Sequence, residues 1–375
     1  MKNKNKEKIT FFLPGMYGGG VERVFLTLAE EMLLRGYEID LLLLKKEGDM
    51  LSVVPKQVRI IVPKTYSSKL FPALFMIPAL IRYMRAERPV LFISMLNRCN
   101  VVVSLARMFV RGVPVVVSEH GNFTEQLQVM KWYKRKVAVL VSAFTYRLAD
   151  TILAVSYGTA EVLAKHLWLK KDSIEVIYNP VNITKVQKMA EEQFDTTLLD
   201  IAKKNFVSVG RLNKEKNFPL LLDAFAIVLQ KEPEARLLIL GEGEERAVLE
   251  KKMKELGISN FVRMPGFVDN PYPYMKNADV FALSSDWEGF GVVIVEALAC
   301  GTSVVATDCP SGPAEILIDE SCGSLVPVGD NVSMSESITF LLNSNKNVNI
   351  LKKRANDFTV SKVTDKYLNL IKDYN

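Results

Sequence analysis

Short apolar runs alternate with amphipathic stretches along the whole chain. Residues 8–13 have the pattern of a buried strand, a glycine-rich turn follows, and residues 21–33 place apolar side chains at helical spacing. Similar apolar runs predict further strands at 38–44, 90–94, 113–118, 151–155 and 175–178. Strands that are apolar throughout and divided by helices indicate a parallel sheet with helices on both faces.

The same alternation restarts in the second half of the chain. It predicts strands at 206–209, 236–240, 261–264, 280–284 and 303–307, with helices at 219–229 and 244–256. The polar, helix-like stretch 183–204 marks the boundary. The fold class is therefore α/β, with two Rossmann-like, doubly wound domains at 1–182 and 183–358 that face each other across a cleft. We expect an amphipathic helix in 359–375 to pack back on the first domain.

The composition is that of a globular protein of two domains, with 375 residues, 49% apolar and 24% charged. The longest apolar run, residues 70–81, is broken by two prolines and is too short to span a membrane. We find no signal peptide, and four widely spaced cysteines favour neither a zinc site nor a disulfide framework. These features predict a protein of the reducing cytoplasm.

The net charge of +6 conceals a difference between the halves. Residues 1–180 carry 26 basic and 15 acidic side chains, whereas the remainder carries 22 and 27. A basic first half indicates an anionic partner, with nucleic acid and an anionic membrane surface as the candidates.

Two loops have the composition of phosphate-binding sites. The first holds Gly15 and three consecutive glycines, Gly18 to Gly20, before a predicted helix, where backbone N–H groups can meet an anion. The alternative is a tight turn without a ligand. In the second, Arg211 and Lys216 follow a predicted strand and could hold a diphosphate, although a solvated basic loop has the same composition.

The stretch that begins at Ser285 is the most informative in the chain. Glu288 precedes a glycine-flanked turn, and Glu296 follows in an otherwise apolar helix, where an unpartnered carboxylate would be costly. The hydroxyls of a ribose would satisfy it. A buried ion pair with a neighbouring Arg or Lys is the alternative.

Together these segments resemble the retaining glycosyltransferases of the GT-B fold, glycosyltransferase family 4. The resemblance covers essentially the whole chain and is strongest over 206–315. It rests on the glycine-rich first loop and on motifs that occur in the family's order, namely Gly210-Arg211-Leu212, Lys216-Asn217, Gly241-Glu242-Gly243, Gly266-Phe267-Val268, Glu288-Gly289-Phe290-Gly291, Glu296 and Ser311-Gly312-Pro313-Ala314-Glu315-Ile316.

The resemblance implies a role for individual residues. Arg211 and Lys216 would neutralise the donor diphosphate as it leaves, Glu288 would contact the transferred sugar, and His120 matches a histidine placed near that sugar. These four would be the catalytic residues. The donor site would be completed by the ribose-binding Glu296 and by the loops that meet phosphates and base, through Gly18, Gly19, Phe267, Val268, Gly289, Phe290 and Gly291.

We therefore expect a retaining transferase that moves a hexose or N-acetylhexosamine from a nucleoside-diphosphate sugar, with UDP favoured by the resemblance. No Asp-x-Asp sequence occurs. Since Arg211 and Lys216 can stabilise the leaving group, we expect no metal ion and no other cofactor. Front-face displacement, in which the departing diphosphate helps to remove the acceptor proton, is the mechanism that we favour.

The acceptor should face the basic first half, with Arg98, Asn100 and Glu119 as candidate contacts. Residues 131–136 join a basic and aromatic segment to the apolar residues 137–144, and residues 66–88 mix apolar and basic side chains. Such segments favour an anionic membrane surface, although 137–144 could instead belong to the core. We expect a glycan or polyprenyl-diphosphate-linked acceptor for bacterial surface polysaccharide or glycoprotein glycans, and a peripheral position on the inner face of the cytoplasmic membrane.

Two other functions compete with transfer. A sugar-nucleotide epimerase of similar two-domain fold would bind the same donor, but Glu288 and the two cations favour transfer. Nucleic-acid binding would use the basic half, yet the sequence contains no recognisable nucleic-acid module, and we expect no such partner.

Overall fold

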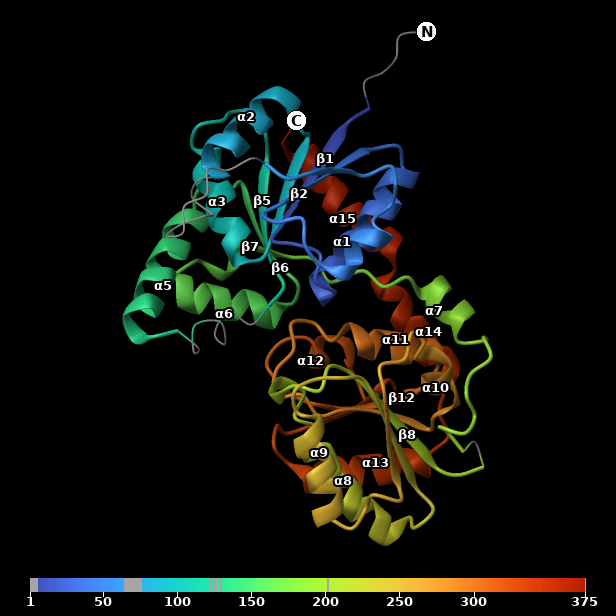
Figure 1. Ribbon diagram of the computed structural model, residues 1–375. Coiled ribbons are helices and arrows are strands. Elements are labelled where there is room, and N and C mark those ends of the chain that lie inside the picture. Colours follow the sequence, from blue (N-terminus) through green and yellow to red (C-terminus); the bar gives the residue numbers. More distant parts are fainter. Residues whose placement is uncertain are drawn as a thin grey trace. The chain divides into compact units, whose positions relative to one another are not determined.

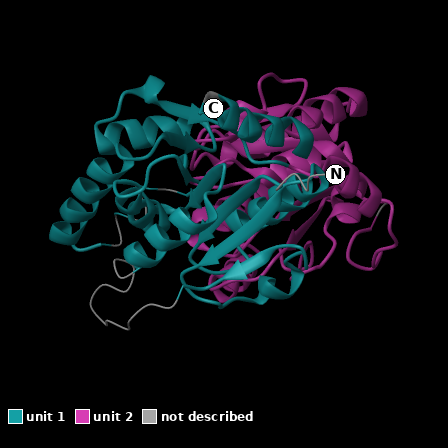
Figure 2. Ribbon diagram, turned by 90° about the horizontal axis from the view of Figure 1, so that it is seen from above, with its two compact units in different colours: residues 1–180, 360–375 teal, residues 181–359 magenta. Residues whose placement is uncertain are grey.

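The computed structural model describes residues 6–63, 76–121, 123, 127, 130–200 and 202–374. They form two compact units, unit 1 (Met1–Pro180 with Val360–Asn375) and unit 2 (Val181–Thr359), shown in Figure 2. The expected limits, after residues 182 and 358, lie within two residues of these boundaries. The beginning of the expected basic and apolar segment 66–88 lies outside the described residues.

Unit 1 contains a parallel sheet in the order β3-β2-β1-β4-β5-β6-β7 (Figure 1). Its strands are β1 (Lys8–Leu13), β2 (Glu38–Leu43), β3 (Arg59–Ile61), β4 (Leu91–Met95), β5 (Val115–Glu119), β6 (Thr151–Ala154) and β7 (Ile174–Val176). Its described helices are α1 (Gly20–Leu34), η1 (Asp49–Val53), α2 (Ile77–Glu87), α3 (Asn97–Arg107), α5 (Trp132–Tyr146), α6 (Tyr157–Leu167), η3 (Lys171–Ser173) and α15 (Val360–Asp373).

Unit 2 repeats this plan with a parallel sheet in the order β10-β9-β8-β11-β12-β13. Its strands are β8 (Asn205–Val209), β9 (Arg236–Leu240), β10 (Val262–Gly266), β11 (Val280–Leu283), β12 (Ser303–Thr307) and β13 (Gly323–Val326). Its helices in the described part are α7 (Ile183–Met189), η4 (Lys214–Lys216), α8 (Phe218–Lys231), α9 (Arg246–Glu255), α10 (Tyr272–Asn277), α11 (Val292–Cys300), α12 (Pro313–Ile316), α13 (Asn331–Leu342), α14 (Val348–Ala355) and η5 (Asn356–Phe358).

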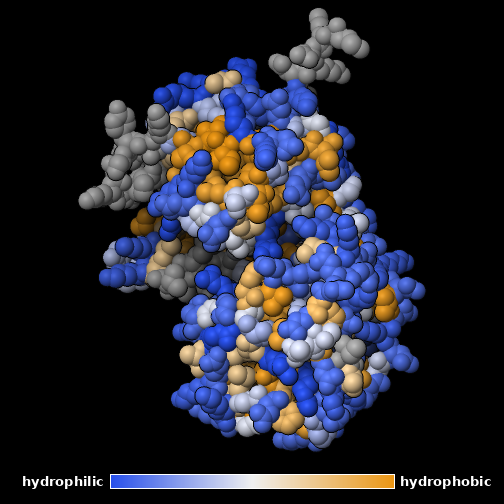
Figure 3. Space-filling model, turned by 45° about the vertical axis from the view of Figure 1, so that its right-hand side comes forward, coloured by the Kyte–Doolittle hydropathy of each residue, from blue (hydrophilic) through white to orange (hydrophobic). Residues whose placement is uncertain are grey.

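Helices cover both faces of the unit 1 sheet because its strands are apolar on both sides. Phe11 packs against Phe25 of α1, with ring centroids 5.1 Å apart, whereas its neighbour Phe12 packs against Phe92 in the core of the opposite face. The last helix, α15, belongs to the first of these cores through residues such as Tyr367. The structure thus places the C-terminal helix in unit 1. The surface shown in Figure 3 is mainly hydrophilic, with scattered apolar patches.

The stretch 183–204 differs from the sequence prediction, since helix α7 ends at Met189. Farther along, Asp195 accepts hydrogen bonds from the backbone N–H and the hydroxyl of Thr197, at 2.9 and 2.7 Å. Such local bonds from short polar side chains compete with helix formation. The polar composition was therefore compatible with a helix but did not require one.

Both sheets have a point where the strand order reverses, between β1 and β4 in unit 1 and between β8 and β11 in unit 2. Doubly wound sheets bind ligands beyond the carboxyl ends of the strands at such points. The loops that follow β1, β8 and β11 contain the glycine cluster, Arg211 with Lys216, and Glu288. The fold therefore carries the predicted motifs to the ligand-binding edge of each sheet.

Candidate active site

In unit 2, the loop after β8 and the loop after β11 are joined by a buried charge pair. The ammonium of Lys216 donates to Oε1 of Glu288, and Ser285 Oγ donates to the same oxygen over 2.7 Å. The Lys216 and Glu288 side chains are only 20% and 10% exposed. The two residues predicted to hold diphosphate and sugar thus share one site.

Hydrogen bonds from side chains hold these two loops together. Ser284 Oγ donates to the Lys216 carbonyl over 2.8 Å, and Asn217 caps α8 while its amide donates to Asp286 over 2.7 Å. Arg211 lies at the start of the same loop, with an exposed side chain. Its cationic group therefore stands on the same loop as Lys216 and is open to solvent.

The glycines of the Gly241-Glu242-Gly243 motif allow the loop after β9 to approach the loop after β8. A Cβ atom on Gly241 would lie 1.9 Å from the carbonyl oxygen of Gly210, and one on Gly243 would lie 2.2 Å from that of Leu212. The backbones are joined by a hydrogen bond from Leu212 N–H to the Glu242 carbonyl, at 2.9 Å. The two glycines therefore allow the loops after β8 and β9 to pack closely, a role that the sequence alone did not reveal.

Glu296 lies on α11 and accepts a hydrogen bond from the hydroxyl of Tyr272 over 2.9 Å. Tyr272 begins α10, and Thr302, just after α11, donates from Oγ1 to the Met275 carbonyl of α10 over 2.6 Å. Sequence reasoning missed Tyr272, because an aromatic residue in a Pro-rich segment has no distinctive spacing. A tyrosine hydroxyl therefore meets this carboxylate.

The remaining donor-side positions lie in the loops after β10 and β11. Phe267 follows β10 and is 66% exposed, so its ring is available for stacking, and Val268 is half-buried beside it. Phe290 is buried against Phe358, with ring centroids 5.3 Å apart. Gly291 is the N-cap of α11 (Val292–Cys300) and has a φ of 88°, which favours glycine. Gly289 and Phe290 can therefore present backbone groups rather than side chains to a ligand.

The glycine-rich loop of unit 1 already holds an acidic side chain. Glu22, on the first turn of α1, is buried, and its Oε1 accepts the backbone N–H of Tyr17 over 3.3 Å. A Cβ atom on Gly19 would lie 2.8 Å from Oε2 of Glu22, and Gly18 has a φ of 94°. Glu22 is the residue that sequence analysis missed here, and its carboxylate lies beside the expected phosphate-binding glycines.

His120 lies just after β5 and is buried. Its Nε2 is 2.9 Å from Ser118 Oγ. Burial lowers the pKa of His120 to about 4, so the ring is neutral around pH 7. Asn100 and Glu119, expected as acceptor contacts, are fully buried, and both reach the hydroxyl of Tyr146 on α5. Arg98 is exposed at the start of α3.

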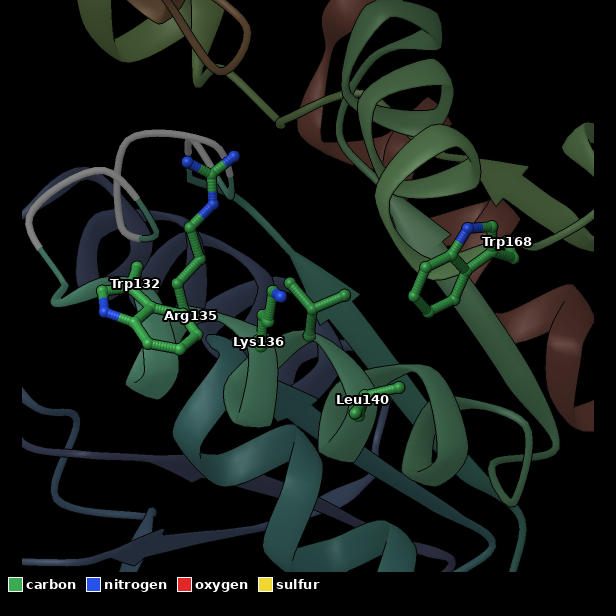
Figure 4. A pocket seen from close by; sticks show the side chains of 6 residues that line it. Trp132, Arg135, Lys136, Leu140 and Trp168 are labelled. Atoms are coloured by element: carbon green, nitrogen blue, oxygen red, sulfur yellow. The ribbon is translucent and has the colours of Figure 1, made fainter.

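Helix α5 presents apolar and basic side chains to solvent. Val137, Leu140 and Phe144 are 59%, 59% and 57% exposed, whereas Ala143 is buried in the core of unit 1. The stretch 137–144 is therefore divided between core and surface. Figure 4 shows Trp168, at the end of α6, across a hollow of about 560 Å³ from α5; its other lining residues are Trp132, Arg135, Lys136, Val139 and Leu140.

Three further findings concern metal ligands, the second histidine and membrane-spanning helices. Within residues 6–63, 76–121 and 130–374, apart from 201, no three His, Cys, Asp or Glu side chains gather closely enough to hold a metal ion. His166 is bonded to the Val162 carbonyl at 2.9 Å within α6, as expected for a structural histidine. In the same described ranges, no helix has the length and apolar character needed to cross a membrane.

Comparisons with known proteins agree with this arrangement. The model for glycosyltransferase family 4 matches residues 18–185, and the model for glycosyl transferases group 1 matches residues 189–358. The structure of HepE from Anabaena in complex with UDP and glucose has a TM-score of 0.78, with 21% identity over 98% of this chain and 100% of that chain. The lipopolysaccharide galactosyltransferase WaaB has a TM-score of 0.77, with 21% identity over 98% and 100%. These likenesses define a two-domain enzyme of the GT-B class.

Sequence relatives give the family. An N-acetylgalactosamine-N,N'-diacetylbacillosaminyl-diphospho-undecaprenol 4-α-N-acetylgalactosaminyltransferase of Campylobacter jejuni is 32% identical over 367 residues, 96% of each chain. A second transferase of that organism, which extends a diphospho-undecaprenol-linked glycan with N-acetylgalactosamine, is 26% identical over 97% of this chain and 98% of its own. The chain therefore belongs to the group 1 glycosyltransferases of family 4 type with the GT-B fold. The epimerase alternative gains no support from these relatives.

Proposed function

We propose that unit 2 binds a nucleoside-diphosphate sugar through Arg211, Lys216, Glu288 and Glu296, and that the enzyme transfers the sugar with retention of configuration. The observation that supports this most directly is the shared site of Lys216 and Glu288 at the reversal point of the unit 2 sheet. When the donor binds, its diphosphate replaces Glu288 as the partner of the Lys216 ammonium. The carboxylate of Glu288 is then available to accept a hydrogen bond from a sugar hydroxyl. Arg211 and Lys216 then stabilise the negative charge that develops on the departing diphosphate.

Transfer at this site needs neither a metal ion nor another cofactor. Arg211 and Lys216 supply two positive charges, and a guanidinium can bind phosphate oxygens in a bidentate manner. The departing diphosphate accepts the proton of the acceptor hydroxyl in a front-face displacement, so the protein contributes positioning and charge stabilisation. Loss of turnover on addition of a chelator would refute metal independence.

UDP is the nucleotide that we propose, with Phe267 stacking on the base and Glu296 accepting from the ribose hydroxyls. The solved complex of HepE with UDP supports this choice, although it shares only the fold. The relatives from Campylobacter support N-acetylgalactosamine as the sugar and a polyprenyl-diphosphate-linked glycan as the acceptor. The synthesis of a bacterial surface polysaccharide or of a glycoprotein glycan would use such a reaction.

We further propose that α5 docks on the anionic inner face of the cytoplasmic membrane, which carries such an acceptor. The helix combines exposed Trp132, Leu140 and Phe144 with Lys134, Arg135 and Lys136, which are also exposed. Aromatic and apolar side chains insert at the headgroup boundary, while each basic residue near an anionic surface contributes about 1 kcal/mol.

A matched pair of variants tests the role of Lys216. Lys216→Ala should lower kcat by about a hundredfold or more, the typical cost of removing one charge-stabilising donor, while UDP binds with a similar Kd. Lys214→Ala removes an exposed cation from the same short helix η4 and should leave kcat intact. Steady-state kinetics with UDP-N-acetylgalactosamine and calorimetric binding of UDP measure both effects. Equal kcat values for the two variants would contradict the proposal.

A further inference from the structure

A fully buried acid lies next to His120. Glu119 is the last residue of β5, has no exposed surface, and takes part in none of the ion pairs that the described residues form. Burial raises its pKa to about 7, against the opposing effect of hydrogen bonds from Tyr146 and the Gly121 N–H. The protonation state of this side chain is therefore balanced close to neutral pH.

The hydrogen bonds around Glu119 fix the direction in which the Tyr146 hydroxyl donates its proton. The amide of Asn100 donates to the Ser118 carbonyl and to the Tyr146 hydroxyl, both over 3.0 Å, and Asn97 donates to the same hydroxyl over 3.2 Å. Because that hydroxyl accepts two bonds, its one proton goes to Oε2 of Glu119, 2.8 Å away.

Two oxygens in this network then lack a donor. Within the described residues, Oδ1 of Asn100 and Oε1 of Glu119 have no hydrogen-bond partner. The amide oxygen can only accept a hydrogen bond, and so can Oε1 when Glu119 is ionised. A proton on Oε1 converts one acceptor into a donor and also removes an uncompensated buried charge. Both considerations favour the neutral acid.

Among the residues that the structure describes, none forms an ion pair with Glu119 that would offset this preference. Strand β6 pairs alongside through Ala154, and Arg98 at the start of α3 is exposed. The other titratable groups around the segment 118–120 are uncharged near pH 7, namely Tyr146 of α5, His120, Cys99 of α3 and Tyr367 of α15, which lies beside Ser118.

We infer that Glu119 is a positioning residue that holds the segment 118–120, and with it His120, only while it carries a proton. The same network fixes Ser118, whose side chain contacts the His120 ring and whose carbonyl is held by Asn100. Ionisation places a buried negative charge in this network and displaces the segment. Activity is then lost on the alkaline side because of Glu119. This inference rests on the proposed transfer reaction and on the place near the transferred sugar that the family resemblance implies for His120.

The pH profile of kcat/KM distinguishes Glu119 from His120. The wild-type value should fall above about pH 7, whereas His120, with a pKa of about 4, cannot titrate there. Glu119→Gln keeps the shape of the neutral acid but cannot ionise, so its activity relative to wild type should be about tenfold higher at pH 8 than at pH 6. Glu161→Gln, a surface change on α6, should keep the wild-type profile.

A second variant and a direct measurement guard against misfolding. Tyr146→Phe removes a bond that lowers the pKa of Glu119, so the alkaline fall should move to higher pH. Carbon-13 NMR of protein labelled at the glutamate carboxyl should show one resonance that titrates near neutral pH and is absent from Glu119→Gln. Complete ionisation by pH 5 overturns the inference, as does a Glu119→Gln profile that falls like wild type. The NMR result does not depend on turnover, so failure of the proposed transfer reaction remains distinguishable.

Discussion

The stability of unit 1 should depend on pH through Glu119, and Glu119→Gln should remove that dependence. The pKa of Glu119 is raised from an ordinary value of 4.5 to about 7, so the folded state holds a proton that the unfolded chain has lost. The contribution of this group is complete below pH 4.5 and is lost as the pH rises to 7. At 1.36 kcal/mol per pKa unit, the loss amounts to about 3 kcal/mol.

Urea unfolding of the wild type and of Glu119→Gln at a series of pH values measures this difference. A Trp287→Phe background restricts the fluorescence to Trp132 and Trp168, both in unit 1, so that its transition is observed alone. The low pKa of His120 acts in the opposite direction, with stability lost as the pH falls, and does so in both proteins. The free-energy difference between the proteins therefore isolates Glu119. Parallel curves from pH 4 to pH 8 would refute the reasoning.

Three other predictions follow from the structure. Tyr272→Phe removes the hydroxyl that orients Glu296 and should weaken UDP binding about five- to tenfold with kcat little changed; equal Kd values by calorimetry would contradict this. Gly241→Ala introduces a Cβ atom 1.9 Å from a backbone oxygen and should lower the melting temperature of unit 2. In the control Gly257→Ala no atom lies within 4 Å of the new Cβ, so only the cost of the positive φ remains. An equal fall in melting temperature for the two variants would refute the clash. Leu140→Glu should reduce sedimentation with vesicles that contain phosphatidylglycerol, and an unchanged bound fraction at low salt would exclude α5 as the docking surface.

Much of the fold was predictable because apolar periodicity is a local property. Strands β1, β9 and β12 begin and end where the apolar runs predict. Strands β3 and β13 were missed, since they are only three and four residues long and lie at the sheet edges, where half-buried side chains weaken the pattern. Helix α7 was overextended because polar composition alone does not fix where a helix ends.

The candidate site was predictable only where a motif gave both residue type and position. Lys216 and Glu288 were expected in one site, and the structure brings them together, although 72 residues separate them. Tyr272 and Glu22 were missed, because neither has a spacing that marks it. Their roles depend on which loops meet at the edge of a sheet.

By itself, the sequence determined the alternation of strands and helices, the two units and the identity of the charged residues at the strand ends. These follow from hydrophobic period and from residue chemistry, which each segment carries locally. Only the tertiary structure decided that Glu119 is buried against Tyr146 and Asn100, that Glu296 meets a tyrosine, and that the apolar residues of α5 are divided between core and surface. Burial and hydrogen-bond partners arise from contacts between distant segments, and these set the protonation state of a carboxyl group that the chain alone would leave ionised.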